Sequence, residues 1–232
     1  MATTHGGPLA AALHDLQHIF GERLYAFAAY GQPGATPAPS LALVRSITAE
    51  DLDHCASHAA AWHRAGCATP LLLTKDEFAG SLDAFPIEYG EILATHQIIY
   101  GLDPFAGLTI RTDDLRRACE VQVKSHLLHL RENYIESRGR QTEIRELVAD
   151  AAPAFAVIMR RLAQLDGFPA ASAAELSAYA ASRPGLDPRV VGDVLALANQ
   201  QNGSGVDAMR LYPAYLEAVE QLWQYIDRWQ VE

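Results

Sequence analysis

The sequence lacks the features that mark disulfide-rich, membrane-spanning and nucleic-acid-coating proteins. Its three cysteines, Cys55, Cys67 and Cys119, are an odd number without a CxxC pair, which predicts reduced, partly buried thiols and no disulfide, metal or redox centre. No apolar run approaches the roughly 20 residues that a membrane-spanning helix needs. With 18 basic against 28 acidic side chains and a net charge of −10, the chain has no cationic surplus for general nucleic-acid binding.

What the sequence does contain is enough apolar material for a sizeable core. Half of its 232 residues are hydrophobic, which is sufficient for one large domain or two modest ones. The N-terminal stretch MATTHGGPLAAALHDL has neither the basic start nor the apolar core of a signal peptide. We therefore expect a cytoplasmic protein that does not associate with a membrane.

Residues 9–111 alternate between helical and strand-like patterns. Apolar residues at helical spacing predict a first helix over 9–20, and Thr48 with Asp51 predicts a capped second helix that ends near Gly66. A Gly- and Pro-rich stretch, GQPGATPAPS, predicts a loop between the first two strands. Short apolar runs predict five strands: LYAFAAY (24–30), LALVRS (41–46), TPLLLTK (69–75), FPIEYGEI (85–92) and HQIIYG (96–101).

From residue 112 onward the pattern is helical. Thr112, Asp113 and Asp114 open a helix whose apolar residues recur at steps of three and four. A second long helix contains Pro153, which predicts a kink or a split into two helices. Three more helices are predicted at about 172–182, 188–200 and 206–229. The sequence thus predicts an α+β fold, with a small mixed sheet in residues 9–111 and an all-helical, antiparallel bundle in residues 112–232.

A small sheet followed by a helical bundle is similar to the architecture of the aminoglycoside-type nucleotidyltransferases. LYAFAAYG resembles that family's first strand and Gly-Ser turn, and PSLALV resembles the strand that carries its Asp-x-Asp motif. Longer stretches resemble a bacterial group of nucleotidyltransferase-like proteins that implies no established activity: FPIEYGEILATHQIIYGLDPFAGL, DLRRACEVQVKSHLLHLRENYIE, AAPAFAVIMRRLAQLDGFP and LYPAYLEAVEQLWQYID. The helical half also resembles HEPN domains. The resemblance implies a nucleotidyltransferase-like domain in 9–111 and a HEPN-like bundle in 112–232.

The chemistry of nucleotidyl transfer explains why that family needs its motifs. The transition state gathers negative charge on phosphate oxygens, which metal ions neutralise. Mg²⁺ is held by one or two carboxylates and the substrate phosphates. Because alternate residues of a strand point to one face, Asp-x-Asp is the smallest strand motif that offers a metal two side chains. A Gly-Ser turn lets the backbone approach the phosphates.

Transferred to this sequence, the family's polar positions fall on neutral residues. The Gly-Ser pair corresponds to Ala26 and Phe27, the two aspartates to Ser40 and Ala42, and the usual basic positions to Ala28 and Tyr30. Phe27 would occupy the space of the phosphates. A third acid would be Glu88 or Glu91, and one glutamate does not replace the missing pair. The resemblance therefore implies a vestigial cleft and the loss of the metal-dependent reaction.

Three function hypotheses follow. The first is a pseudoenzyme: a catalytically degenerate nucleotidyltransferase-like protein that has no catalytic residue, cofactor or metal and acts as a binding or regulatory module for a nucleotide or small molecule. The second is an active nucleotidyltransferase that holds Mg²⁺ with rearranged ligands, drawn from Glu88, Glu91 and Glu120. The third is a protein-interaction module that binds no nucleotide and whose cleft has been filled.

Histidines offer two further candidate sites. His54 and His58 lie one turn apart after Asp51, a spacing that can bind zinc, with His63 and Cys67 nearby in the sequence. The HExxH glutamate is missing, so a solvated helix face is the favoured interpretation. His126 and His129 lie three residues apart on the first bundle helix, where they either face a cleft or are satisfied by neighbours. The spacing from Arg117 to His126 is too long for the Arg–His pair of HEPN ribonucleases.

The remaining candidates are arginines and tryptophans of the helical half. A cleft lined by arginines would bind phosphate, but the glutamates between these arginines favour ordinary ion pairs along the helices. The arginines are Arg131, Arg138, Arg140, Arg145, Arg160 and Arg161, and the glutamates are Glu132, Glu136, Glu143 and Glu146. Trp229 is a candidate contact for a homodimer, because aromatic residues are enriched at interfaces, whereas Trp223 is expected in the bundle core.

Overall fold

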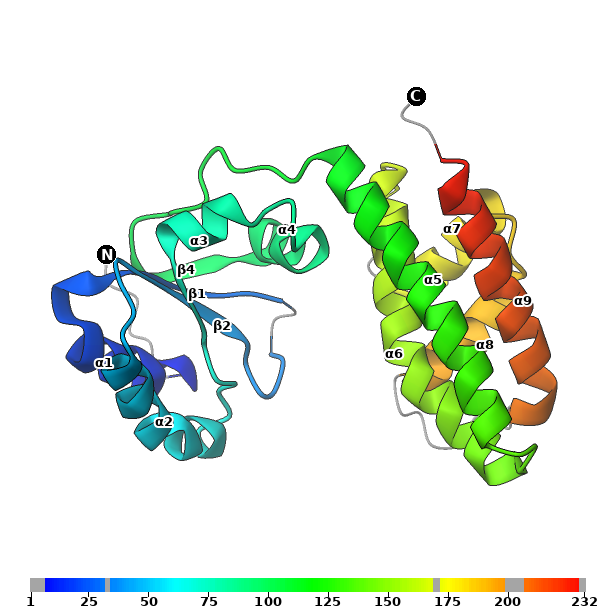
Figure 1. Ribbon diagram of the computed structural model, residues 1–232, viewed down its shortest axis with the longest axis horizontal. Coiled ribbons are helices and arrows are strands. Elements are labelled where there is room, and N and C mark those ends of the chain that lie inside the picture. Colours follow the sequence, from blue (N-terminus) through cyan, green and yellow to red (C-terminus); the bar gives the residue numbers. More distant parts are fainter. Residues whose placement is uncertain (1–6, 32–33, 169–171, 199–206, 230–232) are drawn as a thin grey trace. The chain divides into compact units, whose positions relative to one another are not determined.

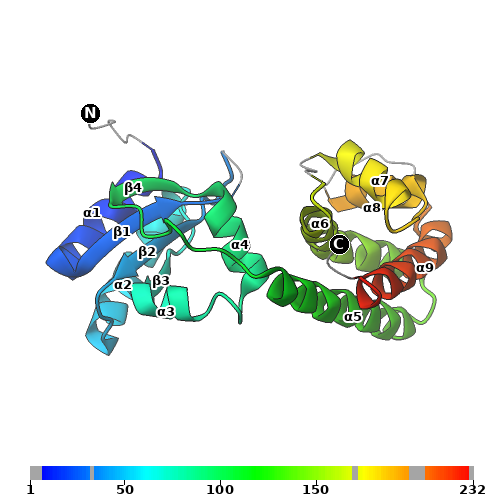
Figure 2. The same ribbon diagram turned by 90° about the horizontal axis from the view of Figure 1, so that it is seen from above.

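The computed structural model describes residues 7–31, 34–168, 172–198 and 207–229. The chain divides into two compact units, Met1–Arg111 and Thr112–Glu232 (Figures 1 and 2). The first unit contains a small mixed sheet with helices, and the described part of the second unit is helical. The α+β fold class predicted from the sequence is therefore confirmed.

The first unit contains four strands and four α-helices in its described residues, joined by short connections. In chain order they are α1 Leu9–Phe20, the 3₁₀ helix η1 Gly21–Arg23, β1 Leu24–Ala29, β2 Ser40–Val44, α2 Ala49–Arg64, β3 Leu71–Thr74, α3 Lys75–Gly80, α4 Pro86–Thr95 and β4 Gln97–Gly101. The strand order in the sheet is β3-β2-β1-β4, with β1 antiparallel to both β2 and β4, and β2 parallel to β3.

Both faces of this sheet are covered by helices (Figure 1). On one face, Phe27 and Ala42 pack with apolar side chains of α1 and α2, among them Phe20 and Trp62. On the other face, strand residues pack against α3, α4 and the segment after β4: Ala26, Ala28, Leu41 and Leu43 meet Phe78, Tyr89, Ile92 and Phe105. Alternate residues of β1 and β2 thus enter two separate cores, as the two-residue period of a strand requires.

The start of α2 is fixed by a capping box joined to an ion pair. Thr48 accepts a hydrogen bond from the backbone N–H of Asp51, whose carboxylate accepts one from the backbone N–H of Thr48. The same carboxylate receives both Nη atoms of Arg23 at 2.7 Å. This confirms the capped helix predicted from Thr48 and Asp51, and it joins η1 to the first turn of α2.

The strand predicted over FPIEYGEI is wrong, because these residues belong to helix α4. Pro86 occupies the first turn of α4, where its missing N–H costs no intrahelical bond. Ile87, Tyr89 and Ile92 are buried, and Tyr89 and Ile92 belong to the core on the face of the sheet that α3 and α4 cover. A short apolar run has no clear period, so strand and helix could not be separated from the sequence alone. The predicted strand over HQIIYG is confirmed as β4.

The described part of the second unit consists of two long helices and three shorter ones. They are α5 Thr112–Glu136, α6 Gln141–Leu165, α7 Ala173–Ser182, α8 Pro188–Ala198 and α9 Ala208–Asp227. The main packed pairs are α5 with α6, α5 with α9, α6 with α8, and α7 with α8. These elements confirm the five predicted helices, although residues 199, 200 and 206 of the predicted ranges lie outside the described residues.

Helix α6 passes through Pro153 without interruption. Of the two predicted outcomes, the split into two helices is therefore wrong, and the kink stays a prediction. Pro153 itself is exposed, while Ala152, Phe155 and Ala156 beside it are buried. The backbone bond that proline removes therefore lies on the solvent side, and core packing of the flanking residues holds the helix together. No helix in the described residues has both the length and the apolar character to cross a membrane.

Candidate functional site

The strand positions that we expected, from the resemblance, at the place of a catalytic motif lie inside the two cores. Phe27, Ala42 and Ser40 are at most 1% exposed, and Ala26 is 2% exposed. Ser40 and Ala42 point to the same face, as alternate residues do, and this face is filled by α1 and α2. Ala26 points to the other face, toward Phe78 and Tyr89. The four residues of the expected vestigial cleft therefore lie against packed side chains.

The three glutamates named as alternative metal ligands lie on two helices. Glu88 is exposed on α4, and Glu91 is half-buried one turn later, where its charge adds to burial in raising the pKa of Tyr30. Glu120 lies on α5 in the second unit, 3.0 Å from Nη1 of Arg116. Within the described residues, no group of three or more His, Cys, Asp and Glu side chains is arranged to hold a metal ion.

The histidines of α2 have separate partners. The carboxylate of Asp15 on α1 lies 3.1 Å from Nδ1 of His58 and accepts the indole N–H of Trp62 at 2.8 Å. His63 shares a hydrogen bond with Thr69, and the carboxylate of Asp51 is engaged by Arg23 as described above. His54 and His63 are exposed, as a solvated helix face predicts, whereas His58 is half-buried against Asp15 of α1.

The three cysteines are free thiols, as predicted from their number and spacing. Cys67 and Cys119 are buried and Cys55 is half-buried. Burial raises the pKa of the Cys119 thiol to about 12, so this thiol stays protonated and unreactive at neutral pH.

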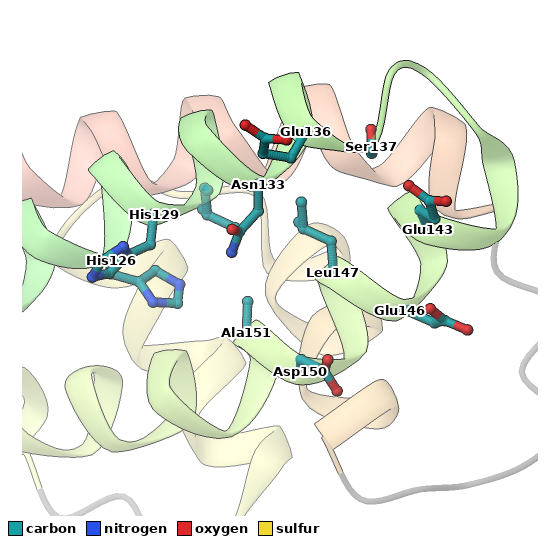
Figure 3. Close-up of a pocket in the computed structure, with 11 residues that line it drawn as sticks. His126, His129, Asn133, Glu136, Ser137, Glu143, Glu146, Leu147, Asp150 and Ala151 are labelled. Atoms are coloured by element: carbon teal, nitrogen blue, oxygen red, sulfur yellow. The ribbon is translucent and has the colours of Figure 1, made fainter.

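A hollow lies within the second unit, along α5 and α6 (Figure 3). We call it the acidic groove. Its volume is about 550 Å³, and its lining residues are His126, His129, Leu130, Asn133, Glu136, Ser137, Glu143, Glu146, Leu147, Asp150 and Ala151. Four carboxylates and no lysine or arginine are among these residues. At neutral pH the groove therefore favours positively charged groups.

Helix geometry explains why these side chains meet. His126, His129, Asn133 and Glu136 follow one another at steps of three and four, so they share one face of α5. Glu143, Glu146 and Asp150 do the same on α6. Because α5 and α6 are joined by a short turn and pack along their length, the two polar rows face the same groove. The glutamates were predicted as ion-pair partners of arginines, and Glu143 is one; their shared helical face was in addition a signal for a common surface.

His126 forms the buried end of the acidic groove. It is 8% exposed, and its Nε2 shares a 2.6 Å hydrogen bond with the hydroxyl of Tyr215 from α9. Its ring stacks near Phe155, which packs edge-on against Tyr215 at 5.1 Å between centroids. Burial, and then the charge of nearby His129, lowers the pKa of His126 to about 4. At neutral pH His126 is therefore uncharged and leaves the groove negative.

Arg140 pairs with one of the glutamates predicted as its helical partners, Glu143, at a spacing of i,i+3 instead of i,i+4. Arg131 and Arg161 have other partners: Arg131 on α5 pairs with Glu220 on α9, and buried Arg161 donates to the side chain of Gln164 at 3.0 Å. Among the residues that line the acidic groove there is no arginine.

Asp166, at the end of α6, is a polar hub that the sequence analysis missed. Its Oδ2 accepts hydrogen bonds from the hydroxyls of Tyr179 and Tyr225, both at 2.6 Å, and its Oδ1 accepts the indole N–H of Trp229 at 2.7 Å. Burial and this carboxylate raise the pKa of both tyrosines, so each remains a donor. Trp229, predicted as a dimer contact, thus makes a hydrogen bond within its own unit. Trp223, which was expected in the bundle core, is half-buried and lies beneath the ammonium of Lys124.

Comparisons with protein-family models and with curated proteins found no match for this chain. The nucleotidyltransferase resemblance therefore remains a prediction from the sequence.

Proposed function

We propose that the protein is a catalytically degenerate nucleotidyltransferase-like protein that works as a binding module, and that its acidic groove contacts positively charged ligands. The observation that carries the first part is the burial of Ser40, Ala42 and Phe27 in an apolar core. A carboxylate pair at these strand positions would have to be ionised and solvent-accessible to hold Mg²⁺ between protein and phosphates. Here the corresponding positions are neutral and packed.

The charge of the acidic groove supports the second part. Four carboxylates, Glu136, Glu143, Glu146 and Asp150, line it, and the lining residues include no basic side chain except the two histidines. Glu143 is already paired with Arg140, which is not a lining residue, so the charge of the groove rests mainly on the other three carboxylates. A nucleoside triphosphate would meet repulsion there, whereas an amine or guanidinium group would gain charge-assisted hydrogen bonds. A volume of about 550 Å³ is sufficient for a small molecule or for several side chains of a protein partner.

Turnover assays test the loss of catalysis. The full chain is incubated with Mg²⁺, labelled ATP, GTP or CTP and a panel of aminoglycoside acceptors, and we expect no transfer product. Metal-dependent product that disappears in Glu88→Gln or Glu91→Gln would instead support an active enzyme with rearranged ligands.

Calorimetry with spermine tests the acidic groove. We expect binding to the wild-type chain at moderate salt and at least about tenfold weaker binding to the double variant Glu146→Gln/Asp150→Asn, since a lost tenfold corresponds to about 1.4 kcal/mol. The matched control is Glu50→Gln/Asp53→Asn, which removes two exposed charges from α2. Equal weakening in both double variants would show that spermine senses only the net charge of −10 and would refute the site.

A further inference from the structure

Helix α5 carries a row of exposed apolar side chains beside the acidic groove. Val121, Leu128 and Ile135 are 64%, 52% and 73% exposed, and each lies seven residues after the last. Seven residues are close to two helical turns, so the three side chains lie on one side of α5 over a length of about 21 Å. We call this row the α5 stripe.

The α5 stripe adjoins the groove directly. His129 and Glu136 follow Leu128 and Ile135 by one residue, which places them about 100° further round the helix, and both line the groove. On the other flank of the stripe lie Lys124, above the ring of Trp223, and Arg131, paired with Glu220. From the groove to the far flank of α5, the surface therefore changes from acidic side chains to the apolar stripe, and then to Lys124 and the Arg131–Glu220 ion pair.

We propose that the α5 stripe and the acidic groove together dock an amphipathic helix of a partner protein that is basic along the edge facing the groove. The proposal rests on the proposed function, because it takes the groove's selection of cations as given, and it names the partner class. The charge complementarity argues for this occupant. Apolar residues of the partner helix would cover Val121, Leu128 and Ile135, while its Lys or Arg row would reach the groove carboxylates, in the manner of helix-in-groove recognition.

The geometry also sets the partner's length and polarity. A stripe of about 21 Å requires a helix of about 14 residues or more, with apolar side chains repeating every seven positions or at steps of three and four. A cation on its opposite edge would approach the ammonium of Lys124 and be repelled, whereas the charge of Arg131 there is already balanced by Glu220. The site therefore discriminates by the side on which the partner carries its basic row as well as by net charge.

Fluorescence anisotropy with a designed probe tests the docking site. The probe is a fluorescein-labelled helical peptide of about 18 residues built from Leu, Lys and Ala, with Leu at heptad spacing and Lys along one edge. The full chain is titrated into this peptide, into a scrambled peptide of the same composition, and into a version with Glu in place of Lys. We expect micromolar binding of the first peptide, and at least about tenfold weaker binding of the other two.

Two variants separate docking from general attraction. Ile135→Asn removes an exposed apolar side chain of the stripe without adding charge, and we expect it to weaken binding at least about tenfold. Leu52→Asn is the matched control, because Leu52 on α2 is 52% exposed, the same as Leu128 in the stripe; we expect it to leave binding unchanged. Equal binding of the scrambled peptide, or undiminished binding by Ile135→Asn, overturns the proposal.

Two other occupants of the stripe would give different results, each of which also overturns the proposal. If a second copy covers the stripe, sedimentation shows a dimer that Ile135→Asn converts to a monomer. If part of the same chain covers it, Ile135→Asn lowers the thermal midpoint by several degrees while Leu52→Asn does not. In a further outcome, the peptide fails to bind while spermine still binds the wild-type chain more tightly than Glu146→Gln/Asp150→Asn. That result refutes only the docked helix, and the proposed cation binding by the groove is retained.

Discussion

The buried histidine of the acidic groove leads to a specific prediction for the pH dependence of stability. Because the pKa of His126 is lowered to about 4 in the folded chain, the unfolded chain takes up this proton first as the pH falls. The free energy of unfolding therefore falls between about pH 6.5 and pH 4 and is constant, for this group, on either side of that window. Above this pH range His126 is neutral in both the folded and the unfolded chain, so its titration does not change the free energy of unfolding.

The size of the effect follows from the difference between the two pKa values. A shift from 6.5 to about 4 corresponds to a full loss of about 3 kcal/mol below the window. Between about pH 7 and pH 5 the same linkage gives a loss of about 2 kcal/mol. This is a large share of the stability of an ordinary domain, which is about 5–15 kcal/mol.

Urea unfolding followed by circular dichroism measures this loss in the wild-type chain and in His126→Gln. Glutamine keeps a polar group beside the hydroxyl of Tyr215 but does not titrate, so we expect the variant to lose about 2 kcal/mol less than wild type between about pH 7 and pH 5. His54→Gln, which makes the same substitution at an exposed histidine of α2, is the control. If His126→Gln and wild type lose the same free energy over this range, His126 is not the group responsible and the reasoning fails.

Three further predictions concern the contacts that hold each unit together. The hydrogen bonds from Arg23 and the cap of α2 lower the pKa of Asp51, so its stabilising contribution is present above about pH 4 and is lost as the pH falls. In urea unfolding, Asp51→Asn should lower the free energy of unfolding by at least about 1 kcal/mol at neutral pH and should reduce its further fall in acid. Gly101 has φ of +83°, and a Cβ there would lie 2.2 Å from the carbonyl oxygen of Tyr25, so Gly101→Ala should cost at least about 2 kcal/mol in thermal unfolding; an unchanged midpoint would contradict this. Asp166→Ala leaves three donors without their acceptor and should cost about 3 kcal/mol, with increased hydrogen exchange at the end of α9, whereas a loss below about 0.5 kcal/mol would show that water replaces the carboxylate.

Local patterns in the sequence were sufficient for most elements of the fold. The capping box of Thr48 and Asp51 fixed the start of α2, and heptad-like apolar spacing located α5, α6 and α9. The strand predicted at FPIEYGEI failed because a short apolar run suits either structure, and only its packing under the sheet decides for a helix. The split at Pro153 failed because propensity is local, whereas burial of Phe155 and its neighbours is tertiary.

The candidate site was harder to predict because it depends on which helix faces meet. The spacing of His126 and His129 marked them as candidates, but their surroundings required the packing of α5 against α6 and α9. The acids Glu143 and Glu146 were visible in the sequence, and their charge was read as helix pairing because the facing row on α5 was unknown. Asp166 accepts a hydrogen bond from Trp229, which lies 63 residues later in the sequence. Spacing along the sequence does not predict contacts over such a separation.

The strand order β3-β2-β1-β4 has a consequence for the biosynthesis of the chain. The strand β1 pairs on one side with β2, which follows soon after it, and on the other side with β4, so that Ala26 meets Gly101 only when nearly all of the first unit has been translated. Until then a ribosome-bound nascent chain exposes the hydrogen-bonding edge of the apolar segment LYAFAA to any other extended polypeptide. A chain stalled before residue 97 should consequently engage chaperones, whereas one stalled well beyond residue 101 should escape them.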